Sequence, residues 1–428
     1  MNKLTYPSID ERVLTKTLPN GLQVYIIPKQ EVTKSYAVFM TDYGSVHRSF
    51  IPIDGEEEIT VPDGIAHFLE HKLFEKEDRD VFTDFLQNGA SPNAFTSFTK
   101  TAYLFSTTTS VKENVEILLD FVQDPYFSDA SVEKEKGIIA QEIKMYDDQA
   151  DWQAFMGAIR NMFSEHPVHI DIAGTVESIQ KITKEDLYTC YHSFYHPENM
   201  TLCVIGSFDA EELMQMIEAN QQAKTFPTFT NMEKHFPNEP TAVYQKESTI
   251  TLPVSTPKVT IGIKEASYEL SKEEFLRRDV FQEMLLDFFF SSSGRFYEEL
   301  YREGLIDDSF EYSTNVEKSF SFSLISSNTK NPIQLKERLL EQLTSIASLH
   351  VTEDELEVMK KKYLGQLLRS MNSLEFIASQ YVYYHFVELD FFELNTYIQS
   401  ITLEHIHAFI KEWITEEKLT VCTIQQQN

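Results

Sequence analysis

Short hydrophobic runs alternate with longer amphipathic patterns along the whole chain. Runs such as Val24–Ile27 and Val259–Ile263 are rich in β-branched and aromatic side chains, which is typical of strands. Between these runs, apolar positions recur at helical spacing over ten or more residues. We therefore predict an α+β fold in which helices pack against a largely antiparallel sheet.

One stretch of the sequence occurs twice, which indicates an internal repeat. Residues 182–205 and 401–424 each begin with Ile-Thr-x-Glu and end in a β-rich run, and corresponding positions lie 219 residues apart. Thr183 and Thr402 stand where a helix is predicted to begin, and a threonine side chain there can cap the helix. We predict two homologous domains, each with its own antiparallel sheet and its own helices.

A segment rich in Pro, Thr, Asn and Lys separates the two copies. Residues 226–258 contain five prolines, a composition that favours turns and linkers. We therefore predict an N-terminal domain over residues 1–225, a linker over 226–258 and a C-terminal domain over 259–428.

The charge balance excludes two classes of partner. The 428 residues include 67 acidic and 37 basic side chains, so the formal net charge is −30. Nucleic acids and anionic membrane surfaces repel such a chain, and we expect neither as a partner. The charge either steers basic peptides toward the protein or only keeps it soluble, and the sequence leaves both interpretations open.

Cysteine usage and hydropathy favour a cytoplasmic protein. The three cysteines form no CxxC pair, which fits a reducing compartment. The N-terminus has no apolar signal core, and no run reaches the roughly 18 apolar residues of a membrane helix. We expect a soluble, cytoplasmic protein.

An HxxEH motif is the strongest candidate for chemistry in the first half. His67 and His71 are four residues apart, so on a helix they stack on one face and can share a metal ion. Glu70 lies on the same side. The competing interpretation is a solvated helix face with an ordinary Glu–His contact. The apolar stripe of this helix falls on the opposite side and consists of Ile65, Phe68, Leu69 and Leu73.

A second predicted helix, over residues 131–148, offers a further ligand. Glu135 and Glu142 fall inside its apolar stripe, where an unpaired carboxylate is very costly, so we predict that both are buried beside a cation. A metal ion shared with the histidines satisfies them, and a separate salt bridge for each is the alternative. The predicted stripe is Ile138, Ile139, Ile143, Met145 and Tyr146, and the predicted wetter side is Glu133, Lys134, Lys136 and Lys144.

Together, the HxxEH motif and the two downstream glutamates resemble the inverzincin zinc peptidases, the family of pitrilysin, insulysin and mitochondrial processing peptidase. The resemblance covers most of the chain, including residues 195–200, which read Tyr-His-Pro-Glu-Asn-Met. Within the family the chain is most similar to the YmfH-type bacterial subunits. The resemblance implies two homologous α+β domains that form one half of a clam-shell chamber.

The resemblance also implies a role for each motif residue. His67, His71 and Glu142 would bind one zinc ion per chain, and Glu135 would orient one of these ligands. Glu70 would be the general base, taking a proton from the zinc-bound water that attacks a peptide carbonyl. The implied activity is that of a zinc metalloendopeptidase acting on peptides or unfolded segments.

Residues 89–96 resemble the substrate-binding strand of the family. Physically, an extended peptide can add to a free sheet edge through backbone hydrogen bonds. We expect Asn93, Ala94 and Phe95 to contact substrate, with Asn93 bonding its backbone near the scissile bond. An ordinary Ser-Pro-Asn turn that leads into a strand is the alternative.

The second half departs from the catalytic pattern. Its helical pattern at 279–286 carries no histidine, and Leu367 stands where Glu142 would repeat, so we expect one zinc site. Active relatives place an Arg and a Tyr in the stretch 300–308 to clamp substrate. The matching positions here are Tyr301 and Asp307, so that pair is missing.

We expect a partner chain to supply the missing Arg/Tyr pair. This partner would be a homologous subunit without HxxEH, in a heterodimer, with a homodimer also possible. The alternative function is a non-catalytic peptide-binding or assembly subunit whose zinc site is structural or idle.

Overall fold

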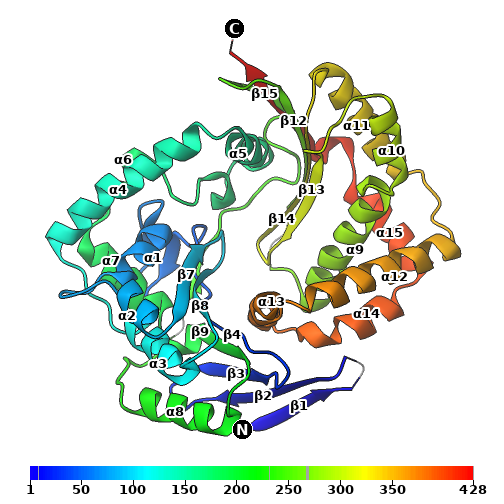
Figure 1. Cartoon of the computed structure of the whole chain (residues 1–428). Coiled ribbons are helices and arrows are strands. Elements are labelled where there is room, and N and C mark those ends of the chain that lie inside the picture. Colours follow the sequence, from blue (N-terminus) through cyan, green and yellow to red (C-terminus); the bar gives the residue numbers. More distant parts are fainter. Residues whose placement is uncertain (8, 231, 267–268, 428) are drawn as a thin grey trace. The chain divides into compact units, whose positions relative to one another are not determined.

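The structure is a computed structural model of the chain, and it describes residues 1–7, 9–230, 232–266 and 269–427 (Figure 1). The chain folds into two compact units, each with its own main sheet. Unit 1 comprises residues 1–143, 170–235 and 370–392. Unit 2 comprises residues 144–169, 236–369 and 393–428.

The two units exchange segments of the chain. Residues 144–169 come from the first half of the sequence and belong to unit 2, whereas residues 370–392 come from the second half and belong to unit 1. The continuous domains predicted at 1–225 and 259–428, with a linker at 226–258, follow the sequence repeat and stay a prediction.

Unit 1 is built on a seven-stranded sheet. Its spatial order is β1 (Asn2–Tyr6), β2 (Glu11–Thr17), β3 (Gln23–Pro28), β9 (Met200–Gly206), β4 (Ser35–Thr41), β8 (Thr101–Thr107) and β7 (Ala90–Thr96). Strands β3 and β9 run parallel, and the other neighbours are antiparallel. The same unit holds a small sheet of β10 (Glu233–Lys234), β5 (Ser49–Ile51) and β6 (Ile59–Thr60).

Unit 2 repeats the topology of five neighbouring strands of unit 1, which lie in the spatial order β3, β9, β4, β8 and β7. Its sheet has the order β11 (Glu247–Leu252), β15 (Leu419–Gln426), β12 (Lys258–Ala266), β14 (Phe320–Asn328) and β13 (Glu311–Val316). Again the first pair is parallel and the others are antiparallel. Cys203 of β9 pairs with Val38 of β4, and Cys422, 219 residues further on in β15, pairs with Thr260 of β12. The predicted α+β class with largely antiparallel sheets is confirmed.

Helices cover both sheets. Those of unit 1 are α1 (Ile65–Phe74), α2 (Phe82–Gln87), α3 (Val111–Val122), α4 (Asp129–Asp147, whose last residues fall in unit 2), α6 (Val176–Ile179), α7 (Lys184–Phe194), α8 (Ala210–Gln222) and α13 (Leu374–Phe386). Those of unit 2 are α5 (Ala150–Met162), α9 (Lys272–Phe290), α10 (Arg295–Arg302), α11 (Pro332–Ile346), α12 (Glu353–Ser370), α14 (Leu394–Ser400) and α15 (Leu403–Trp413). In the described part of the chain, no helix is long and apolar enough to cross a membrane.

The exchanged segments contain helices at the same place in the repeat. Helix α5 follows α4 in the chain and packs against β11, β12 and β15 of unit 2. Helix α13 follows α12 and packs against β4 and β9 of unit 1. Each sheet is therefore covered in part by the corresponding helix of the other half of the sequence.

The two helix caps predicted from the repeat are confirmed. Thr183 precedes α7, and its side chain accepts a hydrogen bond from the Asp186 N–H. Thr402 precedes α15 and accepts from the His405 N–H in the same way. In both, the third helical residue bonds back to the cap, which forms a capping box.

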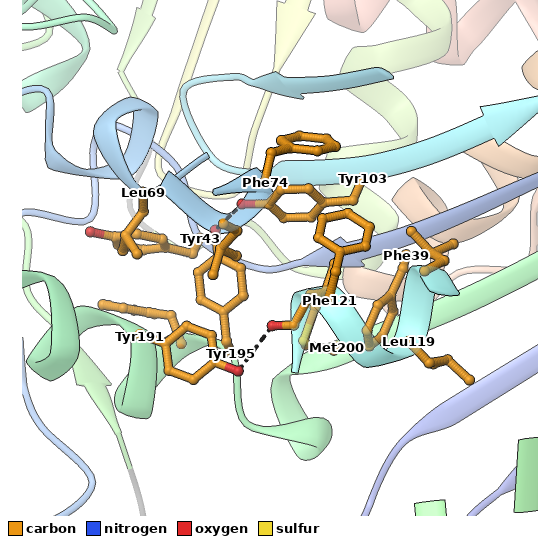
Figure 2. Packing of buried hydrophobic residues seen from close by; sticks show 14 of the residues in the cluster. Phe39, Tyr43, Leu69, Phe74, Tyr103, Leu119, Phe121, Tyr191, Tyr195 and Met200 are labelled. Atoms are coloured by element: carbon orange, nitrogen blue, oxygen red, sulfur yellow. Dashed lines mark hydrogen bonds between the residues drawn. The ribbon is translucent and has the colours of Figure 1, made fainter. Parts of the chain in front are cut away.

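The core of unit 1 lies between the sheet and helices α1, α3 and α7. Leu69 of α1, Phe121 of α3, Tyr191 of α7 and Tyr103 of β8 belong to this buried cluster, and the rings of Phe121 and Tyr103 pack against each other (Figure 2). The buried hydroxyl of Tyr103 is 2.9 Å from that of Tyr195, so these two polar groups satisfy each other inside an apolar region. This core fixes the helix that carries the HxxEH motif.

Candidate metal centre

Helix α1 begins at a position that only glycine fits. Gly64 precedes the helix with φ of 89°, a conformation that other residues rarely adopt. A Cβ atom there would lie 2.3 Å from the Ala173 carbonyl oxygen, so the loop at 173–174 packs directly against the helix start. The predicted apolar stripe is confirmed, because its members are all buried: Ile65, Phe68, Leu69 and Leu73.

The opposite face of α1 carries the motif. The side chains of His67 and His71 are 12% and 28% exposed, and neither belongs to the hydrophobic core. The helical periodicity therefore predicted correctly which way the two histidines point.

Helix α4 begins two residues earlier than predicted, because Ser128 caps it. The Ser128 hydroxyl oxygen accepts a hydrogen bond from the Ser131 N–H at 3.2 Å. The predicted apolar stripe is wrong at two positions, since Ile138 is 44% exposed and Met145 is 51% exposed. The buried face instead consists of Ser131, Val132, Glu135, Lys136, Ile139 and Ile143.

Lys136 is a second correction on α4, because it was expected on the wetter side and is buried. Its ammonium group donates to Glu133 Oε1 at 2.6 Å and to the Gln180 carbonyl oxygen at 3.1 Å. A lysine can bury its aliphatic stem in this way while its charged end reaches polar partners.

The structure brings three predicted ligands together from α1 and α4. One ligand atom each of His67, His71 and Glu142 lies within 4.8 Å of the other two. Glu142 Oε1 is 3.8 Å from His67 Nε2, and Glu142 Oε2 is 3.6 Å from His71 Nε2. Tetrahedral zinc with bonds of about 2.0–2.2 Å separates its ligand atoms by roughly 3.5 Å, so this set fits the ion.

Glu142 is less buried than predicted, with its side chain 24% exposed. Glu135 is buried as predicted, and its Oε1 lies 3.0 Å from His71 Nδ1. With Nδ1 bonded to Glu135, the His71 ring presents Nε2 to Glu142. In metal sites, the ring nitrogen of a histidine that does not bind the metal commonly bonds to a carboxylate, which orients the ring.

The pKa values of the two histidines are shifted in opposite directions. Burial, followed by the neighbouring His71, lowers the pKa of His67 to about 3. Burial also acts to lower the pKa of His71, but the hydrogen bond to Glu135 and the carboxylates of Glu70 and Glu142 outweigh it and raise that pKa. His67 is therefore held neutral, the form that binds metal. Its buried Nδ1 has no hydrogen-bond partner among the described residues.

Glu70 has a partner that the sequence did not reveal. The Thr96 hydroxyl donates to Glu70 Oε2 at 2.6 Å. Burial raises the pKa of Glu70, although this hydrogen bond acts against the shift. A carboxylate with a raised pKa is a better proton acceptor than an exposed one. Thr96 lies in a predicted strand, but nothing in the sequence indicates that its hydroxyl meets the motif.

The predicted substrate-binding residues lie on an edge strand. Strand β7 pairs with β8 on one side and has no strand partner on the other among the described residues. Asn93 and Phe95 are exposed, Ala94 is half-buried, and Pro92, which lacks an N–H, is tolerated at such an edge. Asn93 Oδ1 accepts the Ala94 N–H at 2.9 Å, so its own side chain covers a backbone donor.

In unit 2, an ion pair joins helices α9 and α12. Asp287 of α9 faces Lys362 of α12, with 2.7 Å between Oδ2 and Nζ. Asp287 Oδ1 accepts from Tyr312 of β13 at 2.8 Å and from Gln366 of α12 at 3.0 Å. The Lys362 ammonium group thus balances the charge of the buried Asp287 carboxylate. Neither α9 nor α12 contains a histidine.

The stretch expected to hold the Arg/Tyr pair has other contacts. Tyr301 is 59% exposed at the end of α10, and Arg302 forms an ion pair with Glu298 at 2.8 Å. Asp307 accepts the Ser309 N–H at 2.9 Å within a turn. Leu367, at the position expected to match Glu142, is half-buried on α12.

Comparisons with known proteins match both halves of the chain to one peptidase family. A family model described as "Insulinase (Peptidase family M16)" matches residues 57–176, which include the HxxEH motif. A second model, described as "Peptidase M16 inactive domain", matches residues 181–363. YmfH of Bacillus subtilis, named an uncharacterized zinc protease, is 46% identical over 98% of both chains.

Solved structures give the same result. An M16-like peptidase from Alicyclobacillus acidocaldarius superimposes with a TM-score of 0.94 at 39% identity, covering 97% of this chain and 99% of the other. A protease from Helicobacter pylori superimposes with a TM-score of 0.80 at 18% identity, covering 97% of this chain and all of the other. At that identity the second likeness concerns the fold alone.

Proposed function

The chain belongs to the M16, insulinase-like family of peptidases, and we propose that it is a zinc-dependent endopeptidase subunit acting on peptides or unfolded segments. The observation that carries the proposal is the convergence of His67, His71 and Glu142 on one point, with Glu70 on the same helix. The relative named a zinc protease supports it.

In this proposal His67, His71 and Glu142 hold one zinc ion per chain. When bound, zinc supplies a Lewis acid that acidifies water and polarises a peptide carbonyl. Glu135 holds the His71 ring by its Nδ1 and keeps Nε2 directed to the ligand cluster. Three protein ligands leave a fourth position open, as a catalytic site requires.

Glu70 is the proposed general base. It accepts the proton of the attacking water and then passes that proton to the amine that leaves. Burial raises the pKa of Glu70, which favours the first of these steps because the carboxylate binds the proton more readily than an exposed one.

The free edge of β7 is the proposed substrate-binding site. An extended peptide would add to this edge as a further strand, next to α1, against which β7 packs. The Ala94 N–H, now bonded to the Asn93 side chain, would bond a substrate carbonyl instead. The side chains of Asn93 and Phe95 lie exposed on the same strand and would flank the peptide.

We propose a homologous partner subunit without HxxEH, most simply in a heterodimer. It would supply the Arg/Tyr pair and close over the substrate as the other half of a chamber. The support comes from unit 2, where Arg302 is paired with Glu298 and Tyr312 is bonded to Asp287.

Glu70→Gln tests the proposed function. The substitution keeps the side-chain volume and removes the base, so we expect cleavage to fall by about 1,000-fold. Zinc content should stay at one ion per chain, because Glu70 is not a proposed ligand. The measurement is a peptide-library digest of wild type and variant, with and without the partner chain, together with metal analysis.

Glu113→Gln is the matched control, since Glu113 is exposed in the first turn of α3 and should leave cleavage unchanged. If Glu70→Gln cleaves like wild type, the catalytic proposal is wrong. If no combination of chains cleaves any peptide while zinc is bound, the alternative applies, a peptide-binding or assembly subunit with a structural or idle zinc.

A further inference from the structure

A hydroxyl group at the end of the edge strand holds the proposed base. Thr96 is the last residue of β7, and its Oγ1 donates to Glu70 Oε2 at 2.6 Å. No other hydrogen bond to the Glu70 carboxylate occurs among the described residues. One carboxylate oxygen is thus held from the strand, and the other is left to accept a proton.

The turn after Thr96 is fixed by the segment that follows β4. The Ser45 N–H donates to the Ser97 carbonyl at 3.1 Å, and the Val46 N–H donates to the Phe98 carbonyl at 2.9 Å. A Cβ atom on Gly44 would lie 2.5 Å from the Ser97 carbonyl oxygen, so the two segments lie in direct backbone contact.

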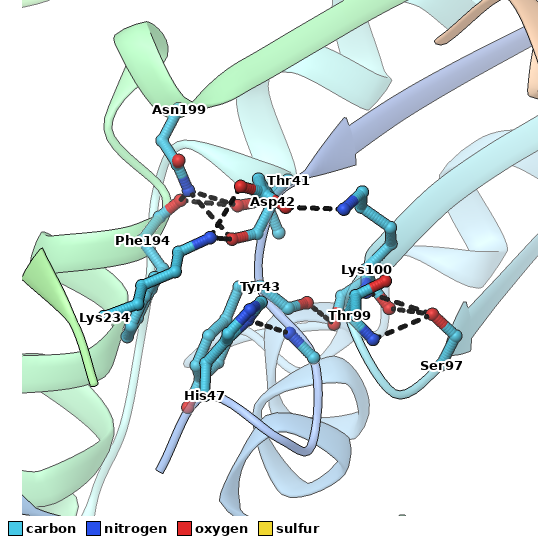
Figure 3. Close-up of polar contacts among 12 residues, drawn as sticks. Thr41, Asp42, Tyr43, His47, Ser97, Thr99, Lys100, Phe194, Asn199 and Lys234 are labelled. Atoms are coloured by element: carbon cyan, nitrogen blue, oxygen red, sulfur yellow. Dashed lines mark hydrogen bonds and ion pairs between the residues drawn. The ribbon is translucent and has the colours of Figure 1, made fainter. Parts of the chain in front are cut away.

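An ion triad ties the same turn to the sheet (Figure 3). Lys100 Nζ lies 2.6 Å from Asp42 Oδ1, and Lys234 Nζ lies 2.6 Å from Asp42 Oδ2. Burial acts to raise the pKa of Asp42, but these two ammonium groups outweigh it and hold that pKa well below its usual range. The turn that follows Thr96 is therefore anchored by both backbone bonds and charges.

We propose that Thr96 is a positioning residue for Glu70, setting the direction in which the carboxylate meets the attacking water. This inference rests on the proposed function, in which Glu70 is the base. A glutamate side chain has three rotatable bonds, and an unheld carboxylate samples several orientations. A hydrogen bond from a fixed strand removes that freedom before substrate arrives, which lowers the barrier by preorganisation.

A purely structural bond is the competing explanation. In unit 2, Tyr312 of β13 donates to Asp287 of α9 at 2.8 Å, so a hydroxyl on the edge strand meets a helix carboxylate there as well. Neither α9 nor α12 contains a histidine. The experiment must therefore include measurements that a structural contact would leave unchanged.

The test compares Thr96→Val, which removes the hydroxyl and keeps the shape, with Thr96→Ser, which keeps the hydroxyl. Thr107→Val is the matched control, because Thr107 lies on β8 opposite Ala90, at the other end of β7. The full chain, with its partner where cleavage needs one, is assayed for kcat, KM and zinc content. A crystal structure of Thr96→Val records the position of the Glu70 carboxylate.

We expect Thr96→Val to lower kcat about tenfold, with KM and zinc content unchanged, since one positioning hydrogen bond is worth roughly a factor of ten. Thr96→Ser should stay within about twofold of wild type. In the crystal, the Glu70 carboxylate of Thr96→Val should leave its wild-type position. If this variant does not fold, Thr96→Ala takes its place in every measurement.

Three activity results would overturn the inference: an unchanged kcat, a loss that Thr96→Ser shares, or a loss that follows zinc content. A Glu70 carboxylate that keeps its wild-type position in Thr96→Val overturns it too. That last measurement needs no activity. If wild type cleaves nothing, the proposed function fails, and the crystal structure still decides the role of Thr96.

Discussion

At the scale of single residues, charged groups in this protein acquire their roles from the partners they meet. Glu135 is buried against His71, whereas Glu133, two positions away on the same helix, is exposed and pairs with the buried Lys136. The same type of side chain therefore supports a metal ligand in one place and solvates a helix face in the other. Burial and the identity of the partner make the difference.

The Glu135 contact predicts a graded loss of zinc affinity. Glu135→Gln keeps an acceptor for His71 Nδ1 and loses the charge, so we expect about tenfold weaker binding. Glu135→Ala loses both, and about 100-fold weaker binding is expected. Chelator competition measures the dissociation constants, with Glu133→Ala as the control on the same helix. Equal affinity in all four proteins would show that Glu135 does not support the ligand.

At the scale of elements, two helices and an edge strand meet in each unit through different side chains. In unit 1, α1, α4 and β7 contribute the histidines, the two glutamates and Thr96. In unit 2, α9, α12 and β13 contribute Asp287, Lys362 with Gln366, and Tyr312. The predicted metal ligands of unit 1 come from α1 and α4, whereas an ion pair joins α9 and α12 in unit 2.

This ion pair predicts a stability cost with no effect on the metal. Lys362→Met leaves the Asp287 carboxylate, which is 8% exposed, without its cation. We expect the free energy of unfolding of unit 2 to fall by about 2 kcal/mol. The loss is smaller than for a fully buried pair because Lys362 is partly exposed. Urea denaturation measures the loss, and zinc content should stay the same.

The double variant Lys362→Met with Asp287→Asn is the control for that experiment. It replaces the charge pair by two neutral groups, so much of the lost stability should return. A double variant as unstable as the single one would mean that packing of the lysine stem, and not the charge of Asp287, determines the cost.

At the scale of the whole molecule, the net charge is −30, and only a few of the acidic residues have a proposed role. Glu70, Glu135 and Glu142 lie in the candidate centre, and many other acids are exposed on helices. A field of this sign attracts cationic peptides over a distance that salt shortens. Solvation remains the alternative use of the same charge.

Salt dependence separates these two uses. If the field steers substrate, raising the salt from about 0.05 M to about 0.3 M should lower kcat/KM for a Lys-rich peptide by about fivefold. A neutral peptide of the same length and cleavage site serves as the control and should change little. Parallel curves for the two peptides would assign the charge to solubility alone.

Sequence by itself determined the local features of this protein. Helical periodicity placed the histidines opposite the core, the repeat located two threonine helix caps, and hydrophobic runs indicated the strands. Each of these depends on neighbours within a few residues. Periodicity failed on α4, where Lys136 is buried and Ile138 is exposed, because the surrounding elements decide which side of a helix is covered.

Only the tertiary structure decided how distant segments meet. The bond from Glu135 to His71 spans 64 positions and the Thr96 bond to Glu70 spans 26, and neither has a local signal. The exchange of α5 and α13 between the units is equally absent from the pattern. Hydrophobic periodicity records that a face is buried and not what buries it, so the partners of each face emerge only when the whole chain packs.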